Sequence, residues 1–567
     1  MEWKNLLTQD TQVVREQAPE EFEEQYSISD FEKDYQSIIS SSAFRRLQDK
    51  TQVFPLDKSD FVRTRLTHSI EVSTLARQLG MMVTQNEFFR RRFAEEFELS
   101  KEERPNLLAE IPMVLSCAAL LHDIGNPPFG HFGEFAIGNW FEEELESDKF
   151  TFRNEKIAER FAKHSYGRQM KSDLIHFEGN AQALRILTKI YNNSASYNIN
   201  LSYSVINSLV KYPTDSVNYD SKSEDIRLHK FGYFFAEKGI FHEICEKTGT
   251  KMHDGFVRHP LAFLVESADD IAYVTADLED ALKKGLFSLD EFIDFYEQEL
   301  EKIQDKKYKR YSKKLLDLLK CRMRLLSDKS KNGKNNDILE NLFHKLRSQM
   351  DAESDADERE EFLDNILREL KSKVRADDKR NSESDLILFQ KWMEYDVRRW
   401  LMYIVSYSFC KPQNAEKIID GNYKLELFDD TFHQETIKIL KKAMKKFVFN
   451  DIEILKLELS ANKIISALMG DFIYAVIHWD EQQAENKGFE PSKAEQKLIN
   501  IIPESYKNDY RNAVKKRMDA MKEDEEYDSN EFETEKLYLR FLMVTDFISG
   551  MTDSYAKNLY HELNGLE

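Results

Sequence analysis

The chain contains 567 residues, of which 41% are hydrophobic, and it carries a formal net charge of −21. This length and apolar content are enough for a large buried core and about two to four units of ordinary domain size, which excludes a disordered chain. The acidic balance disfavours general binding to polyanions while leaving room for local basic pockets.

The sequence also disfavours a membrane-spanning protein and a protein stabilised by disulfides. No stretch of about 18 apolar residues occurs, so we expect no membrane span. The first residues, MEWKNLLTQDTQ, lack the features of an ordinary secretory signal, so we expect a cytoplasmic protein. The four cysteines lie far apart without a CxxC spacing, which predicts reduced packing residues and neither a structural zinc site nor a disulfide framework. They are Cys117, Cys245, Cys321 and Cys410.

The chain reads as mostly helical, because glycine and proline are scarce, at 18 and 11 residues, and alternating strand patterns are rare. The first long element is a predicted helix from Asp30 to Lys50, with Ser29 or Asp30 near its cap. A second helix follows in TRLTHSIEV. Arg65 and His68 lie one turn apart near its start, so their side chains project from the same side. The alternative interpretation is a capped surface helix with a stray histidine.

The next element, Val114 to Glu134, ends an apolar helical run with an adjacent imidazole and carboxylate, His122 and Asp123. A buried pair of this kind is costly unless it is hydrogen-bonded or metal-bound. Glycines and prolines then turn the chain, which places His131 and Glu134 on the following loop or helix start. By itself the first pair is equally compatible with a hydrogen-bonded pair in the core.

A third helix, Arg258 to Leu282, is apolar over much of its surface but is interrupted by acidic residues. Asp269, Tyr273 and Asp277 recur every fourth residue and therefore share one face. Acidic groups on a mostly buried face call for a cation. The alternative is a network of salt bridges with the lysines that end the helix.

Together these segments supply two imidazoles and two carboxylates from three helices. Such a mixed nitrogen and oxygen set suits a six-coordinate Mg²⁺, Mn²⁺ or Fe²⁺ with open positions for water and phosphate oxygens, and it suits Zn²⁺ less well. The arrangement resembles that of the HD-domain phosphohydrolases. The predicted ligands are His68, His122, Asp123 and Asp269.

The chain resembles one branch of that superfamily more specifically, the deoxyguanosinetriphosphate triphosphohydrolases. A series of blocks appears in the order found in that family, from about residue 30 to the carboxyl terminus. The resemblance implies an all-α fold, with an HD-domain core, additional C-terminal helices and a charged helical insertion. The blocks are RRLQDKTQVF with TRLTHSIEV, LLHDIGNPPFGHFGE, FEGNAQALRIL, VKYP, ESADDIAYVTADLEDAL and DFISGMTDSYA.

The resemblance implies hydrolysis of dGTP, and of other deoxynucleoside triphosphates, to the deoxynucleoside and inorganic triphosphate, with water attacking the α-phosphorus. One divalent metal, Mg²⁺ or Mn²⁺, would act as a Lewis acid. His131 and Glu134 match the catalytic dyad of the family, in which the carboxylate orients the imidazole for proton transfer. Whether His131 serves the attacking water or the leaving 5′-oxygen stays open, and a helix-capping role is the alternative.

The family pattern also assigns residues to the triphosphate and the sugar. A triphosphate carries about four negative charges, which the site must balance with donors. Gln52 corresponds to a residue that faces the 3′-hydroxyl. Tyr273 would pack on the deoxyribose and exclude a 2′-hydroxyl, with Asp277 supporting the sugar or phosphate contacts. The candidates for the phosphates are Arg65, Asn180, Lys211, Tyr212 and Lys230.

Base recognition is assigned to three further residues by their similarity to the purine pocket of the family. Val53 and Phe449 would enclose the base, and Glu458 would accept hydrogen bonds from the N1 and N2 donors of guanine. The stretch FVFNDIEILKLELSANKII matches none of the quoted blocks. On a helix, Phe449 and Glu458 are equally compatible with a core and a solvent position.

We expect three regions: a catalytic core of the HD type at 1–300, a charged helical insertion at 301–385, and a C-terminal helical region at 386–567. The last would complete the nucleotide pocket and carry oligomer contacts, because relatives form homo-oligomers, often hexamers. The insertion begins with the basic amphipathic KKYKRYSKKLLDLLKCRMRLL, followed by the polar linker SDKSKNGKNND and a mixed-charge segment. Its basic helix could bind single-stranded DNA, form a solvated face or contact another subunit.

Two other functions are compatible with the metal set. One is an HD phosphohydrolase that acts on another nucleotide, such as a cyclic or alarmone nucleotide. The other is a sensor without catalysis, in which an HD pocket binds nucleotide to control assembly. The sensor would need no catalytic dyad, whereas this sequence has both His131 and Glu134.

Overall fold

A computed structural model describes most of the chain and confirms the all-α prediction. The strands in the described part are short antiparallel pairs, β1 (Thr151–Phe152) with β2 (Glu155–Lys156) and β3 (Lys251–Met252) with β4 (Gly255–Phe256). No described helix combines the length and the apolar character that crossing a bilayer requires. The described residues are 1–15, 28–54, 61–97, 104–190, 199–253, 255–326, 382–479, 491–523 and 529–566.

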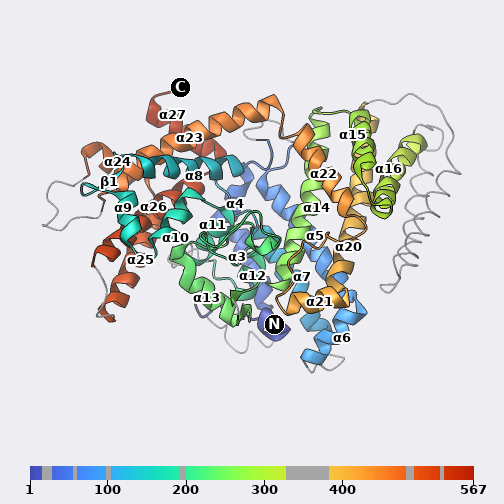
Figure 1. Cartoon of the computed structure of the whole chain (residues 1–567), viewed down its shortest axis with the longest axis horizontal. Coiled ribbons are helices and arrows are strands. Elements are labelled where there is room, and N and C mark those ends of the chain that lie inside the picture. Colours follow the sequence, from blue (N-terminus) through green and yellow to red (C-terminus); the bar gives the residue numbers. More distant parts are fainter. Residues whose placement is uncertain are drawn as a thin grey trace.

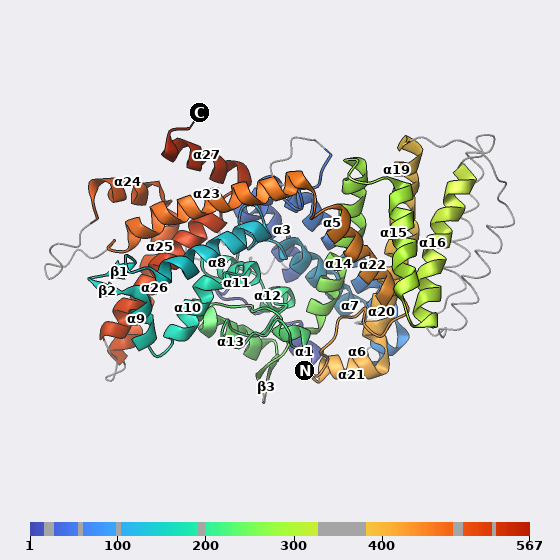
Figure 2. The same cartoon turned by 45° about the horizontal axis from the view of Figure 1, so that its top comes forward.

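The centre of the molecule is built from helices that carry the predicted site. α5 (Arg65–Gln85) packs along α7 (Arg104–Leu121) and against α14 (Pro260–Lys283). α8 (His131–Glu146) follows α7 after a turn. Figures 1 and 2 show α5, α7 and α14 close together, near the centre of the long axis and toward its right side. The apolar faces of these helices belong to one hydrophobic core that extends from Trp3 to Leu559.

The predicted helix from Asp30 to Lys50 is wrong in one respect, because it is three short helices. α3 (Asp30–Ser40), α4 (Ser42–Arg46) and the 3₁₀ helix η1 (Leu47–Asp49) follow one another. Ser41 interrupts the helix: its backbone is extended, at φ −72° and ψ 145°, and its hydroxyl accepts the N–H of Phe44 and so caps α4. Serine competes with helical hydrogen bonding in this way. The predicted cap is confirmed, since the side chain of Ser29 caps α3.

The C-terminal helices cover the central helices. α22 (Gln434–Phe447) packs on α14, and α23 (Ile452–Val476) runs along α8 and α26 (Ser529–Ser549). α23 is seen above α8 in both Figure 1 and Figure 2. The chain ends with α27 (Asp553–Asn564), which follows a short turn after α26 and contacts α23. The three predicted regions stay a prediction.

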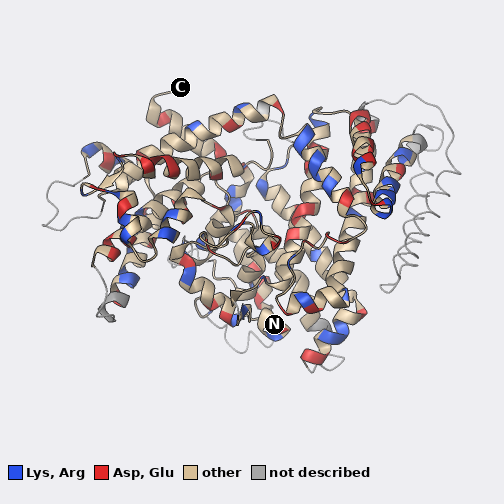
Figure 3. Ribbon diagram, viewed as in Figure 1, with Lys and Arg blue, Asp and Glu red and all other residues tan. Residues whose placement is uncertain are grey.

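The described start of the insertion is the expected basic amphipathic helix. α16 (Lys306–Leu326) buries leucines against α15 (Leu289–Lys302) and α22. Figure 3 shows acidic residues on α15 beside the basic residues of α16. Lys309 pairs with Glu301 at 2.9 Å, so part of the basic face is already neutralised. The predicted polar linker and most of the mixed-charge segment lie outside the described residues.

The remaining features of the described part are its cysteines and the helices not yet named. All four cysteines are buried, and no disulfide joins them in the described part of the chain. The helices not yet named are α1 (Trp3–Leu6), α6 (Glu87–Glu96), α9 (Ile157–Lys163), α10 (Gly167–Ile175), α11 (Gly179–Arg185), η2 (Ile186–Ile190), α12 (Tyr203–Leu209), η3 (Ile226–Leu228), η4 (Phe235–Glu237), α13 (Lys238–Lys247), α19 (Ser382–Lys391), η6 (Trp392–Arg398), α20 (Arg399–Cys410), α21 (Pro412–Ile419), α24 (Lys493–Ile501) and α25 (Glu504–Glu523).

Candidate metal and nucleotide site

Three of the four predicted metal ligands converge. His68 on α5, His122 just after α7 and Asp269 on α14 each offer one ligand atom, and these atoms lie within 4.8 Å of one another. The Oδ1 atom of Asp269 is 3.3 Å from Nε2 of His68 and 3.4 Å from Nε2 of His122. Residues from three distant segments therefore point at one small volume.

Local structure fixes the orientation of both imidazoles. A capping box at Thr64 starts α5, which places His68 in its first turn on the buried side. α7 ends at Leu121, and the Nδ1 atom of His122 lies 2.7 Å from the carbonyl oxygen of Ala119. An Nδ1–H that donates to this carbonyl leaves the Nε2 lone pair directed into the site, as is usual for metal-binding histidines.

The electrostatics of the site favour a positive charge. Burial alone would lower the pKa of His122, but the charges of Asp123 and Asp269 raise it to about 10. Burial would raise the pKa of Asp269, yet the nearby charges of Lys211 and His122 hold it well below its usual range. The buried Nε2 atom of His122 has no hydrogen-bond partner among the described residues. This donor set fits a divalent cation, which would take the place of the proton on His122.

Asp123 lies beside this trio. Its Oδ2 atom is 3.4 Å from Nε2 of His122 and accepts a 2.6 Å hydrogen bond from Nη1 of Arg65. Its Oδ1 atom accepts a second bond of 2.6 Å, from Nδ2 of Asn126. Both carboxylate oxygens thus have protein partners, and the role of Asp123 as a fourth ligand stays a prediction.

His131 and Glu134 form a hydrogen-bonded pair at the start of α8. The Nδ1–H of His131 donates to Oε2 of Glu134 over 2.7 Å, and Oε1 of Glu134 accepts the backbone N–H of Gly179 at 3.0 Å. The charge of Glu134 raises the pKa of His131. The carboxylate is 10% exposed and the imidazole 75% exposed. Glu134, itself held by Gly179, thus orients an imidazole that is exposed to solvent, an arrangement suited to proton transfer.

The turn before α8 requires glycine at its last position. Gly130 has φ 60° and ψ −131°, a conformation that residues with a side chain avoid. A Cβ atom there would also come within 2.5 Å of Nη2 of Arg65. Glycine therefore lets the backbone that leads into His131 pass directly against the Arg65 guanidinium.

The predicted phosphate-binding cations already have acidic partners. Nζ of Lys211 donates to Oδ2 of Asp269 at 2.9 Å, and Nζ of Lys230 donates to Oε1 of Glu178 at 3.0 Å. The same Oε1 atom accepts a 2.6 Å bond from Nδ2 of Asn180. Sequence reasoning missed Glu178, although it directly precedes the Gly-Asn pair of the FEGNAQALRIL block. The ring of Tyr212 lies 5.6 Å from the Arg258 guanidinium.

Two aromatic residues predicted for sugar and base lie together. The rings of Tyr273 and Phe449 have centroids 6.4 Å apart and are inclined by 17°, a stacked arrangement. The expectation that Phe449 lies on a helix is wrong, because it occupies the turn between α22 and α23. A turn can present the ring to α14, and it remains 36% exposed. Glu458 is half-buried on α23.

Two further predicted residues carry unsatisfied polar atoms. Oε1 of Gln52 and Oδ2 of Asp277 are buried without a hydrogen-bond partner in the described part of the chain. Burial raises the pKa of Asp277 to about 7. Buried polar atoms are rarely left unpaired, so these two atoms are suited to a bound ligand. Val53, next to Gln52, is buried.

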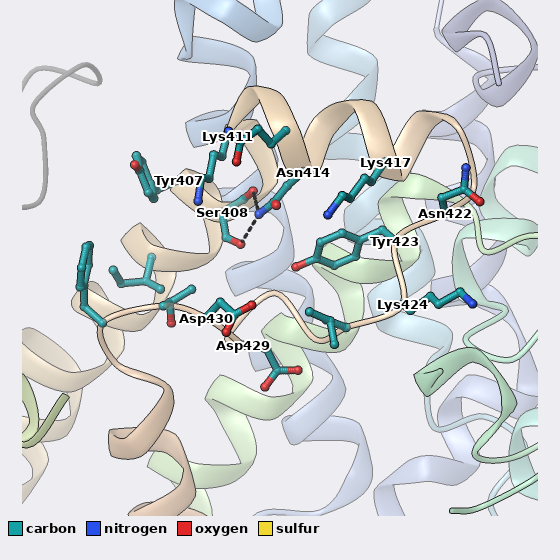
Figure 4. A pocket seen from close by; sticks show the side chains of 15 residues that line it. Tyr407, Ser408, Lys411, Asn414, Lys417, Asn422, Tyr423, Lys424, Asp429 and Asp430 are labelled. Atoms are coloured by element: carbon teal, nitrogen blue, oxygen red, sulfur yellow. Dashed lines mark hydrogen bonds between the residues drawn. The ribbon is translucent and has the colours of Figure 1, made fainter. Parts of the chain in front are cut away.

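A separate pocket lies on another part of the molecule. It has a volume of about 440 Å³ and is lined by residues of α20, α21 and the segment 422–432 (Figure 4). Lys411 and Lys417 line one side, with Asp429 and Asp430 across from them. None of the predicted site residues lines this pocket, so it is not part of the candidate site.

Comparisons with known proteins agree with this geometry. The HD domain family model matches residues 65–184, a stretch that includes His68, His122 and the His131–Glu134 pair. The chain is 35% identical to the deoxyguanosinetriphosphate triphosphohydrolase-like protein of Listeria monocytogenes, over 95% of this chain and 94% of that protein. It is 28% identical to the deoxyguanosinetriphosphate triphosphohydrolase of Yersinia enterocolitica and 27% identical to that of Serratia proteamaculans, each over 97% of this chain and 96% of the relative.

Proposed function

The chain belongs to the deoxyguanosinetriphosphate triphosphohydrolase family of the HD-domain superfamily, and we propose that it hydrolyses dGTP, and other deoxynucleoside triphosphates, to the deoxynucleoside and inorganic triphosphate. In the cell this reaction would limit the deoxynucleotide pool. The observation that carries the proposal is the convergence of His68, His122 and Asp269 together with a His131–Glu134 pair held at 2.7 Å. A site that only senses nucleotide needs no such pair.

The protein would hold one divalent cation, Mg²⁺ or Mn²⁺, through His68, His122 and Asp269, with Asp123 alongside. When bound, the cation supplies Lewis-acid polarisation of a phosphate oxygen and lowers the pKa of bound water. Lys211 orients Asp269 by binding its second oxygen, Oδ2, at 2.9 Å. The two oxygens of Asp269 therefore have different partners, which fixes the plane of the carboxylate.

The dyad supplies proton transfer. Glu134 keeps the proton of His131 on Nδ1, so that Nε2 exchanges a proton with the attacking water or with the leaving 5′-oxygen. Gly179 binds the other oxygen of Glu134 and stops the carboxylate from rotating. Because α8 begins at His131, the position of the imidazole depends on the turn that precedes it.

When the triphosphate binds, its oxygens would replace carboxylates as partners of the cationic side chains in the site. Arg65, Lys211 and Lys230 are each held by a carboxylate and are therefore oriented before substrate arrives. Asn180, whose amide donates to the same oxygen of Glu178 as Lys230, and Tyr212 would be further phosphate contacts. Such positioning lowers the entropic cost of binding a flexible triphosphate.

Sugar and base recognition are the finer part of the proposal. Tyr273 would pack on the deoxyribose and exclude a 2′-hydroxyl, with Gln52 facing the 3′-hydroxyl and Asp277 supporting these contacts. The stacked position of Phe449 beside Tyr273 supports a role in enclosing the base. Val53 would border the same pocket and Glu458 would accept from guanine.

One experiment tests the proposal against its rivals. Purified protein is incubated with each deoxynucleoside triphosphate and with Mg²⁺ or Mn²⁺, and the products are separated by ion-exchange chromatography. Deoxyguanosine with inorganic triphosphate is the expected result. Pyrophosphate or monophosphate as the phosphorus product would point to a different HD phosphohydrolase, and binding without turnover would point to a sensor.

Assembly and DNA binding stay predictions. Homo-oligomer formation, with a hexamer as the family precedent, is measured by light scattering. For single-stranded DNA, the pairing of Lys309 with Glu301 reduces the exposed positive charge of α16. Oligonucleotide binding that is absent, or that does not weaken with salt, would exclude the DNA role.

A further inference from the structure

The DFISGMTDSYA block at 546–556 has no role in the proposed chemistry, yet it lies at the join of α26 and α27 and is largely buried. Its first residue, Asp546, accepts three hydrogen bonds of 2.7–3.0 Å from the guanidinium of Arg185 and one of 2.9 Å from the amide of Gln182. Both donors lie on α11, the helix that begins at Gly179. The block is therefore anchored to the helix whose first N–H holds Glu134.

A buried lysine joins the end of α26 to the turn after α7. Nζ of Lys50 donates to the carbonyl oxygen of Ser549 at 2.7 Å and to that of Asn126 at 2.6 Å. Ser549 is the last residue of α26, where carbonyl groups lack partners within the helix and a cation is favourable. Asn126 in turn donates to Asp123.

Asp553, the first residue of α27, binds two segments at once. It is 2% exposed. Its Oδ1 atom accepts the backbone N–H of Phe129 at 2.8 Å, and its Oδ2 atom accepts the backbone N–H of Thr51 at 3.0 Å together with the Thr51 hydroxyl. Thr51 immediately precedes Gln52, and Phe129 lies two residues before His131. One carboxylate from the end of the chain therefore ties the predicted sugar contact to the turn before the dyad.

The turn that Asp553 holds is strained. Phe129 has φ 63°, which a bulky aromatic residue seldom adopts, and its side chain is buried at 3% exposure. A backbone of this kind is unfavourable and persists only where the surroundings fix it. The hydrogen bond from the Phe129 N–H to Asp553 supplies such a restraint. Without it, the turn would relax toward an ordinary conformation and carry the first turn of α8 with it.

We propose that the DFISGMTDSYA block fixes the turn from Phe129 into α8, an interaction that we call the clamp. We propose further that Asp553 is the positioning residue for the His131–Glu134 dyad. This inference rests on the proposed function only for its kinetic consequence. The structural consequence, a fixed turn from Phe129 into α8, concerns the protein alone. The two consequences can therefore be tested separately.

The test compares Asp553→Asn with Ser554→Ala. Asparagine keeps the size of the side chain, but its single acceptor oxygen can stand beside Thr51 or beside Phe129 and not at both places. The two bonds from Thr51 favour the first position, which turns the amide NH₂ toward the N–H of Phe129. The matched control, Ser554→Ala, removes only the hydroxyl of the next residue of α27, which donates to Asp49 at 2.9 Å. Thr552 keeps its capping bond to the N–H of Tyr555 in both variants, so α27 retains its start.

We expect hydrogen exchange in peptides that cover Phe129–Glu134 to become faster in Asp553→Asn, while peptides from α14 exchange at the wild-type rate. With dGTP, kcat should fall by about 10- to 100-fold while KM and the affinity for Mn²⁺ stay within about threefold, because misplacing a catalytic group by about 1 Å has an effect of this size. Ser554→Ala should match the wild type in all these measurements. Faster exchange throughout the protein, α14 included, would show a general loss of stability and would overturn the assignment of Asp553 to the turn.

Unchanged exchange in the Phe129–Glu134 peptides of Asp553→Asn would overturn the clamp, as would an equal effect in Ser554→Ala. If Asp553→Asn does not fold, Thr51→Val replaces it, because valine removes the hydroxyl bond to Asp553 and keeps the shape. It should speed exchange of the turn to a smaller degree, and wild-type exchange would again refute the clamp. If the wild-type protein hydrolyses no nucleotide, the proposed function fails while the exchange experiment still decides the clamp.

Discussion

Replacing Glu134 by glutamine tests the proposed catalytic dyad with the smallest change in shape. In the structure Oε1 of Glu134 accepts the Gly179 N–H at 3.0 Å and Oε2 accepts Nδ1–H of His131 at 2.7 Å. Glutamine can preserve only the first bond, because its amide nitrogen would then face His131 as a donor. Two donors cannot share a hydrogen bond, so the imidazole must move its proton to Nε2 and present Nδ1 as the acceptor.

The size of the effect follows from this change of tautomer. An imidazole whose Nε2 already carries a proton cannot take one from water, and it loses the carboxylate that stabilises its charged form. General acid–base catalysis contributes about 10²- to 10⁴-fold, or about 3 to 5 kcal/mol of transition-state stabilisation. We therefore expect Glu134→Gln to lower kcat by about 10²- to 10⁴-fold. The affinity for Mn²⁺ should not change, because Glu134 does not belong to the group of converging ligand atoms.

The assay is steady-state release of inorganic triphosphate from dGTP over a range of pH, with the single variants Glu134→Gln and His131→Ala and with the double variant. Because Glu134 raises the pKa of His131, the limb of the pH profile that belongs to His131 should move to lower pH in Glu134→Gln. Loss of activity above that pKa would identify His131 as the acid, and loss below it as the base. The double variant should equal His131→Ala. A Glu134→Gln enzyme with wild-type kcat at every pH would refute the reasoning.

Three further predictions concern the metal, the base and stability. Removing metal with a chelator should abolish hydrolysis, and Mg²⁺ or Mn²⁺ should restore it. Asp269→Asn should weaken Mn²⁺ binding, measured by calorimetry, by at least about tenfold. Binding equal to that of the wild type would remove Asp269 from the ligand set. Glu458→Ala should lower the ratio of dGTP to dATP hydrolysis without changing Mn²⁺ affinity, and an unchanged ratio would exclude Glu458 from the pocket. Burial lowers the pKa of His259 to about 4, and its Nδ1 accepts the N–H of Leu261. As the pH falls, the unfolded chain therefore takes up a proton on His259 before the folded protein does. The free energy of unfolding of the wild type relative to His259→Gln, from urea titrations, should fall by roughly 3 kcal/mol as the pH falls from about 6.5 to 4. A difference that is constant with pH would contradict this.

Local features of the sequence were sufficient for much of the fold. Helix class, the cap at Ser29 and the start of α8 at His131 follow from side-chain spacing and turn residues, whose effects act over a few positions. The same local reasoning failed at Ser41, where a serine hydroxyl competes with the helix. It also placed Phe449 on a helix, although the residue occupies a turn. Neither failure involves a long-range contact; each is a helix boundary, the feature that local preference specifies least sharply.

The sequence by itself determined which residues are candidates for metal binding and proton transfer, because spacing on a helix brings Asp269 near Tyr273 and His131 near Glu134. Only the tertiary structure decided which distant groups complete the site. Glu178 binds Lys230, Arg65 binds Asp123, and Asp553 reaches Phe129 across 424 positions of the chain. Such pairs depend on how whole helices pack, and periodicity within one helix contains no information about the side chains that face it from another.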